Sequence, residues 1–138
     1  MNKSIDYFAV SISPWTYLGH ERFRAIARQA NATVHLKMMD LGTVFAGSGG
    51  LPLKQRAPQR QTYRLQELAR WAQHLNIALT PQPAFFPADT SKINALIVYL
   101  RDQVSTDTAL DLMGTAMASI WGQNLNIADD AVLLNLLS

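Results

Sequence analysis

The stretch Ser13-Pro14-Trp15-Thr16-Tyr17-Leu18-Gly19 stands at the junction between an expected strand over 4–11 and an expected helix over 14–30. The residues before it are mostly apolar, aromatic or β-branched, which is typical of a buried strand. Ser13 is a favourable N-cap residue, and Pro14 at the first helical position lacks an N–H group that would have no partner there. The free N–H groups of such a helix end stabilise an anion. From the local pattern alone, Ser13 is more simply a plain N-cap than a functional residue.

The stretch belongs to a predicted β-α-β unit. A second strand is expected over 32–39, where apolar and polar residues alternate, and Asn31 suits the turn before it. The two strands should be parallel, because the intervening helix carries the chain back to the same end of the sheet. The next stretch, 42–62, is rich in glycine and proline, and we expect a long loop there, a feature that is often functional.

The remainder of the chain has helical patterns. The first covers 62–76, with an apolar stripe that includes Leu68 and Trp71, and an extended segment follows over 80–87. Two further helices are expected after the caps Ser91 and Asp107, and a last one after Asp129 or Asp130. Only two strands are visible, whereas parallel sheets normally have more strands and two covered faces. The pattern therefore favours a fragment or truncated form of a larger fold, or a fold that another chain completes.

Composition excludes several classes of function. The 138 residues amount to one domain or part of one, with a net charge of +2 and no patch of interleaved basic and aromatic residues, so nucleic-acid binding is not expected. The absence of cysteine excludes disulfides, zinc–thiolate sites and CxxC redox chemistry of the protein itself. His20, His35 and His74 have neither metal-site nor triad spacing, so no metal is expected. No signal pattern or membrane-length apolar run is present, and the default expectation is a cytoplasmic protein without a membrane partner.

Several motifs together resemble one family. The chain resembles the 2-hydroxychromene-2-carboxylate isomerase and kappa-class glutathione transferase family, whose thioredoxin-like domain is related to the DsbA oxidoreductases. Its opening signature of strand, Ser-Pro-aromatic-Ser/Thr-aromatic-Leu-Ala/Gly matches throughout the stretch quoted above. The resemblance continues through 40–42, 48–52, 58–63, 68–75, 85–87 and 126–129.

The resemblance implies an α/β fold with a thioredoxin-like β-α-β start. Residues 1–46 would form the N-terminal part of the thioredoxin-like domain. Residues 47–128 would form an inserted all-helical domain with a long loop at its start, and 129–138 the beginning of a truncated helix. The second half of the thioredoxin domain, which in the family carries a valine–cis-proline turn that binds glutathione, would be absent from this chain.

The resemblance also implies a glutathione site. Glutathione brings its own thiol, and the task of the protein is to hold the thiolate, which is the nucleophilic form. Ser13 would be the catalytic residue, donating a hydrogen bond to the sulfur. Arg60, Gly50 and Pro52 would bind glutathione; Arg60 replaces a family lysine and keeps its charge, whereas Gly50 replaces a common asparagine. Lys54 and Arg60 are otherwise ordinary solvated loop cations.

A substrate pocket is the third implication of the resemblance. Trp15 and Tyr17 would flank it, although both are equally compatible with a place in the core beneath the first helix. Phe85 and Phe86 would line it, although they equally suit an anchor between loop and helices. The substrate would be a small aromatic or conjugated compound, and the protein a homodimer.

Three functions follow from these expectations. The first is a glutathione-dependent isomerase of the 2-hydroxychromene-2-carboxylate type, acting by thiolate addition, bond rotation and elimination. The second is a kappa-class-like transferase, in which glutathione stays attached to the electrophile. The third is a non-catalytic truncated fragment or binding module. A thiol–disulfide oxidoreductase is disfavoured, because the chain has no cysteine.

Overall fold

The computed structural model describes residues 3–137 and begins with the expected β-α-β unit. Strands β1 (Lys3–Ala9) and β2 (Ala32–Met38) pair in parallel, with Tyr7 opposite Leu36, and helix α1 (Pro14–Gln29) connects them. Asn31 has a φ of 50° in the turn before β2, a conformation that asparagine adopts more easily than most residues. The mixed α/β character and the order of these three elements confirm the prediction.

The prediction of a long loop over 42–62 is wrong. The chain instead forms helix α2 (Leu41–Ser48), the short 3₁₀ helix η1 (Leu53–Gln55) and the first turn of α3. The Asp40 side chain caps α2, accepting hydrogen bonds from the Gly42 N–H at 2.8 Å and the Thr43 hydroxyl at 2.7 Å. Gly49, with a φ of 73°, ends α2 in the left-handed region. Glycine and proline here mark the ends of short helices, so their density does not indicate a loop.

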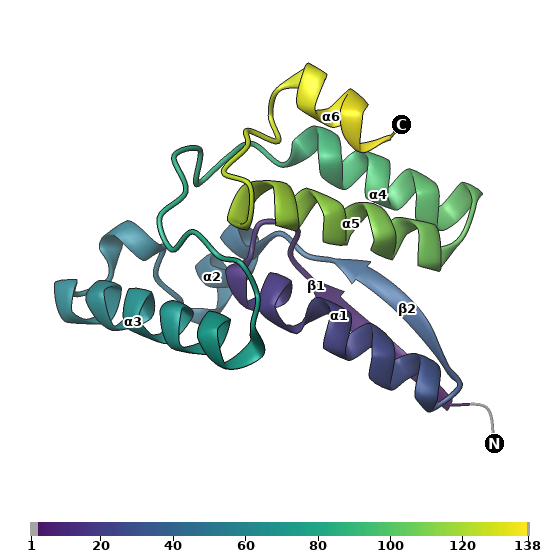
Figure 1. Ribbon diagram of the computed structural model, residues 1–138, viewed down its shortest axis with the longest axis horizontal. Coiled ribbons are helices and arrows are strands. Elements are labelled where there is room, and N and C mark those ends of the chain that lie inside the picture. The colour runs from purple at the N-terminus through teal and green to yellow at the C-terminus, as the bar shows by residue number, and fades with distance from the viewer. Residues whose placement is uncertain (1–2, 138) are drawn as a thin grey trace.

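Four further helices follow: α3 (Pro58–Leu75), α4 (Ser91–Gln103), α5 (Thr106–Trp121) and α6 (Asp130–Leu136). The Asp129 carboxylate caps α6 as expected, accepting from the Ala131 N–H at 2.8 Å. The cap of α5 is Ser105 rather than Asp107, since the Ser105 hydroxyl accepts from the Thr108 N–H at 3.0 Å. Helix α4 starts at Ser91 itself, one residue earlier than a Ser91 cap would place it. Helices α4 and α5 lie side by side, and α6 lies beyond them (Figure 1).

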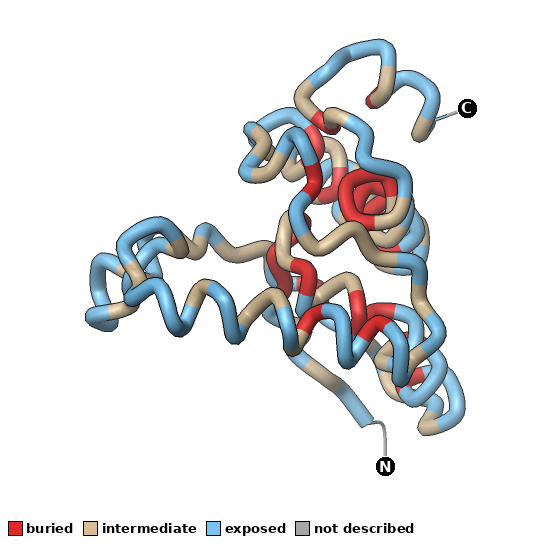
Figure 2. Tube along the Cα trace, turned by 60° about the vertical axis from the view of Figure 1, so that its left-hand side comes forward, coloured by how far each residue is buried: buried red, intermediate tan, exposed pale blue. Residues whose placement is uncertain are grey.

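One hydrophobic core joins the sheet to α4 and α5. Ala9 and Leu36 belong to the same buried cluster as Ile97, Met113 and Trp121. Figure 2 shows the buried residues gathered at the centre of the molecule. This core takes residues from both sides of the boundary expected at 46. The separate helical domain over 47–128 and its boundaries at 46 and 128 stay predictions.

The sheet is covered on one face only within residues 3–137. Alternate residues of both strands face the core, and those between them are exposed: Ser4, Asp6, Phe8, Thr33, His35 and Lys37. Phe8 is 60% exposed, which is unusual for a phenylalanine in the middle of a strand pair. The expectation of a fragment, or of a fold completed by another chain, was based on this two-stranded sheet and stays a prediction.

Helix α3 packs against α1 through a small second cluster. Leu18 of α1 meets Leu68 and Ala72 of α3, and all three are buried. Trp71 was expected in the same apolar stripe, but 42% of it is exposed, because Ala72 occupies the position facing α1. Helices α1 and α3 together carry most of the candidate site. No helix in the described part of the chain is both long and apolar enough to cross a bilayer.

Candidate functional site

Ser13 stands at the start of α1 as the sequence predicts. It is half-buried, its Oγ accepts a hydrogen bond from the Thr16 N–H at 3.3 Å, and Pro14 fills the first helical position. The Ser13 N–H donates to the carbonyl of Val10 at 3.1 Å, which fixes the turn that leads from β1 into the helix. The Ser13 hydroxyl donates to no acceptor among residues 3–137, so its proton is available to a ligand. The first turn of α1 contains no acidic residue, and its positive end is not neutralised locally.

A cavity of about 200 Å³ lies between the start of α1 and the first turns of α3. It brings together two residues that the sequence singled out, Trp15 and Arg60. Trp15 is 45% exposed, so it is a wall of the cavity and not a core residue beneath α1. The remaining lining residues are Arg56, Tyr63, Arg64 and Glu67.

Three arginines therefore face one cavity at intervals of four residues along the chain. Arg56 is fixed by a hydrogen bond from its Nε to the Leu51 carbonyl at 2.8 Å, and its guanidinium lies 5.7 Å from the ring centre of Phe45. Glu67, the acid in the cavity, forms an ion pair with Arg70. Within the described residues no carboxylate lies within ion-pair distance of Arg56, Arg60 or Arg64. The cavity thus carries excess positive charge beside an aromatic wall.

Arg64 is the residue that sequence reasoning missed. Its guanidinium lies over the rings of Phe86 and Trp121, 5.6 and 5.9 Å from their centres. Burial, followed by repulsion from Arg56, lowers the pKa of Arg64. Arg64 also lines an adjoining cavity of about 160 Å³ with Phe86. The sequence signal was its spacing of four residues from Arg60, which places both arginines on one face of the helix. Helical periodicity alone placed Arg64 on the side turned away from the core.

Phe85 and Phe86 have different environments. The ring of Phe86 packs 4.9 Å from that of Trp121 and joins the main core, so Phe86 anchors the 80–87 segment to α5. It also forms part of the wall of the smaller cavity. Phe85 is 46% exposed and lines neither the cavity with Arg60 nor the smaller one with Phe86. The Phe86–Pro87 peptide bond is cis.

Gly50 and Pro52 lie in the link between α2 and η1. A Cβ atom on Gly50 would stand 2.5 Å from Cδ1 of Phe45, so packing at that position requires glycine. Pro52 is exposed and directly precedes η1. Neither residue lines the cavity with Arg60, but Leu51 between them accepts the hydrogen bond that holds Arg56.

Tyr17 faces a different part of the molecule from Trp15. Its hydroxyl donates to the Ala78 carbonyl at 2.9 Å, and its ring borders a groove between α1 and α5. Trp15 lines the cavity with the three arginines and Phe86 lines the smaller cavity beside it, whereas Phe85 and Tyr17 line neither. The substrate pocket made of these four residues stays a prediction. Among residues 3–137 no group of three or more histidine, aspartate or glutamate side chains is arranged to hold a metal ion.

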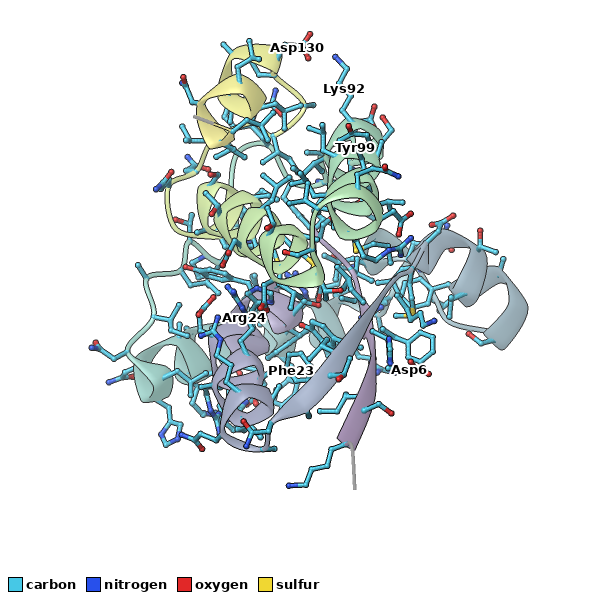
Figure 3. The ribbon with its side chains drawn as sticks, turned by 90° about the vertical axis from the view of Figure 1, so that its right-hand side faces the viewer. Asp6, Phe23, Arg24, Lys92, Tyr99 and Asp130 are labelled. Carbon is cyan, nitrogen blue, oxygen red and sulfur yellow. The ribbon has the colours of Figure 1, made fainter. Side chains whose placement is uncertain are left out.

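His20 and Arg24 form a buried polar pair on α1. The Nε2 of His20 lies 2.9 Å from the Leu110 carbonyl of α5, and Arg24 forms an ion pair with Asp111 at 2.5 Å. Both contacts connect α1 to α5, and Figure 3 shows Arg24 on the side of α1 that faces α5. Burial lowers the pKa of His20, so the ring is neutral at neutral pH.

The buried His20 predicts acid sensitivity of the fold. A folded-state pKa below the ordinary value of about 6.5 means that the unfolded chain binds more protons as the pH falls below about 6.5. The contribution to the free energy of unfolding is complete above that pH and decreases below it. Urea unfolding of the wild type from pH 7 to about pH 5 should show this loss. His20→Gln should have a smaller slope of stability against pH than the wild type. Equal slopes for wild type and His20→Gln would contradict the assignment.

Residues 4–138 match the family model described as a DSBA-like thioredoxin domain. The chain belongs to the DsbA-like thioredoxin family. A 2-hydroxychromene-2-carboxylate isomerase of Sphingobium xenophagum is 27% identical over 131 residues, which are 94% of this chain and 64% of that protein. Glutathione S-transferase kappa 1 of Caenorhabditis elegans is 33% identical over 82 residues, which are 59% of this chain and 36% of the relative.

A solved structure gives the same fold. A 2-hydroxychromene-2-carboxylate isomerase structure superposes with a TM-score of 0.70 at 22% identity, covering 96% of this chain and 65% of the other. The DsbA-like chain thus spans less than two thirds of the length of these relatives. The comparisons confirm the family resemblance and the thioredoxin-like fold.

Proposed function

We propose that this chain carries a glutathione-thiolate site at Ser13 and acts as a glutathione-dependent isomerase on aromatic or conjugated compounds. The observation that carries the proposal is the free hydroxyl proton of Ser13 at the end of a 16-residue helix whose first turn has no acid. One donor and a positive helix end suit a sulfur anion. The names of the relatives, two isomerases and a kappa glutathione transferase, support the choice.

The residues around Ser13 fit the rest of glutathione. The tripeptide has two carboxylates. The cavity between the start of α1 and α3, called the α3 cavity below, offers Arg56, Arg60 and Arg64, and the acid that lines it, Glu67, is paired with Arg70. Planar guanidinium groups bind carboxylates through paired hydrogen bonds. Arg60 is exposed and adjustable, whereas Arg56 is fixed by the Leu51 carbonyl. We propose that Arg60 binds a glutathione carboxylate and that Gly50 and Pro52 shape the link that holds Arg56.

Each residue then has a distinct task. Glutathione, when bound, supplies a thiolate that adds to a conjugated carbonyl compound, allows rotation about the former double bond and leaves again, so that none is consumed. The Ser13 hydroxyl donates a hydrogen bond to the sulfur and so favours the thiolate form near neutral pH. Trp15 offers an exposed aromatic face for a planar substrate. Phe86, fixed against Trp121, holds Arg64 at the edge of the site.

One other function has specific support. The 33% identity to a kappa-class transferase favours attack on an electrophile without elimination. A homodimer is also proposed from the resemblance, and a single well-behaved monomer in a sedimentation experiment would contradict it.

Glutathione binding tests the proposal, measured as thermal stabilisation of the chain. A ligand that binds the folded state alone raises its stability, so millimolar glutathione should raise the melting temperature. Arg60→Gln should weaken binding by about 5- to 10-fold, because a charge-assisted hydrogen bond is lost. The control Arg22→Gln removes an equally exposed arginine from α1 and should bind as the wild type does. No stabilisation by glutathione would reject the site.

A further inference from the structure

A further cavity, larger than the α3 cavity, lies apart from it. It is a groove of about 590 Å³ between α1 and α5, and neither Ser13, Trp15 nor Arg60 lines it. Its depth comes from small residues of α5, Gly114 and Ala118, where larger side chains would fill the space. A Cβ atom on Gly114 would stand 3.0 Å from Cδ2 of His20, so the helices approach closely at the floor. The volume is in the range of small-molecule sites.

The groove carries negative charge in a chain that is basic as a whole. Glu21 of α1 and Asp111 of α5 lie on the guanidinium of Arg24, at 3.5 and 2.5 Å. Two carboxylates and one guanidinium leave one net negative charge, and His20 at the floor is neutral. The contacts with Arg24 and His20 use one oxygen of each carboxylate, Oε1 of Glu21 and Oδ1 of Asp111. The second oxygens have no partner among the residues that the structure describes.

Arg24 itself is not available to a ligand. Its side chain is 7% exposed, whereas those of Glu21 and Asp111 are 71% and 65% exposed. The buried Arg24 guanidinium therefore binds the two exposed carboxylates, Glu21 through Nη1 and Asp111 through Nη2. A ligand anion would have to displace one of these carboxylates, whereas a ligand cation meets both without disturbing the ion pairs. The geometry is complementary to positive charge.

Apolar groups form the rest of the groove. The ring of Tyr17, the side chain of Ile77 and the methyl group of Ala118 line it beside the charged edge. We propose that the groove between α1 and α5 is a second ligand site, for a small organic cation that joins an ammonium group to an apolar body about one ring in size. The ammonium group lies between Glu21 and Asp111, and the apolar body packs against Tyr17, Ile77 and Ala118. The site is independent of the glutathione proposal, because the two cavities share no lining residue.

Amide NMR of the complete chain tests the site with phenethylamine as the probe. We expect saturable shifts at Gly114, Thr115 and the neighbouring turn of α1. Glu21→Gln should raise the dissociation constant about three- to fivefold, as expected for one partly exposed ionic contact. The matched control Asp6→Asn removes the same charge from the opposite side of the strands (Figure 3) and should leave the constant unchanged. Thr115→Phe, which fills the groove from an exposed position, should abolish binding.

Several outcomes would overturn the proposal. The neutral analogue phenylethanol binding as tightly as phenethylamine would show that charge is not recognised, and tighter binding of phenylacetate would show that Arg24 selects anions. Unchanged affinity in both Glu21→Gln and Thr115→Phe, or no saturation, would show that the groove is not the site. Shifts at Gly114 that grow with protein concentration without the probe would assign the groove to a second copy of the chain.

Discussion

Replacing Ser13 by alanine should lower the glutathione-dependent rate by about 10- to 100-fold, the loss expected for one hydrogen bond to a charged group. The expectation rests on the proposed function, in which the Ser13 hydroxyl donates to the thiolate while its oxygen accepts from the Thr16 N–H. The measurement is the steady-state rate at which 2-hydroxychromene-2-carboxylate is isomerised in the presence of glutathione. Ser13→Thr retains a hydroxyl and should keep much of the rate.

The loss of rate in Ser13→Ala must be distinguished from the loss of stability that follows from removing the cap of α1. Removing a side-chain cap costs about 0.5–2 kcal/mol of stability. Ser105→Ala is the matched control, because the Ser105 hydroxyl caps α5 through the same contact to the third helical N–H. It should be destabilised similarly and retain full activity. Ser13 would lose its catalytic assignment if Ser13→Ala turned over glutathione as fast as Ser105→Ala.

Replacing Trp121 by alanine should have the largest effect on stability, about 3–5 kcal/mol, because a fully buried large side chain leaves a cavity. Trp121 packs against Phe86 and carries the guanidinium of Arg64 on its ring. Its carbonyl also accepts a hydrogen bond from the Thr80 N–H at 2.6 Å, at the start of the 80–87 segment. The change should therefore loosen both the core and one wall of the α3 cavity.

Urea unfolding of Trp121→Ala measures this loss. The control is Trp71→Ala on α3, where the ring is 42% exposed and stands nearly perpendicular to that of His74. The control should cost about 1 kcal/mol or less. Similar losses for the two variants would contradict the placement of Trp121 at the centre of the core.

Elements with strong local signals were predictable from the sequence. The alternation in β2, the Ser13 cap with Pro14 behind it and the Asp129 cap are local, and all three are confirmed. The 42–62 stretch failed because glycine and proline were taken as loop residues, although Asp40 and Gly49 cap and end a short helix there. The cap of α5 was predicted at Asp107 instead of Ser105, because an aspartate is also favourable in the first turn of a helix.

The candidate site depends on contacts that no local pattern contains. The family resemblance pointed to Trp15 and Arg60, and the structure places them in one cavity. Arg64 was missed because its environment, the rings of Phe86 and Trp121, comes from segments distant in the chain. The groove between α1 and α5 was missed likewise, since it exists only through the crossing of two helices at His20 and Gly114.

The thiolate site proposed at Ser13 is tested most directly by the pKa of the glutathione thiol when glutathione is bound to this chain. Thiolate absorbs in the ultraviolet, so a pH titration of the complex against free glutathione measures it. We expect a bound pKa below that of free glutathione and a return toward the free value in Ser13→Ala, with Ser105→Ala unchanged. A bound pKa equal to that of free glutathione, or one that Ser13→Ala leaves unaltered, would contradict the assignment of a thiolate site to Ser13.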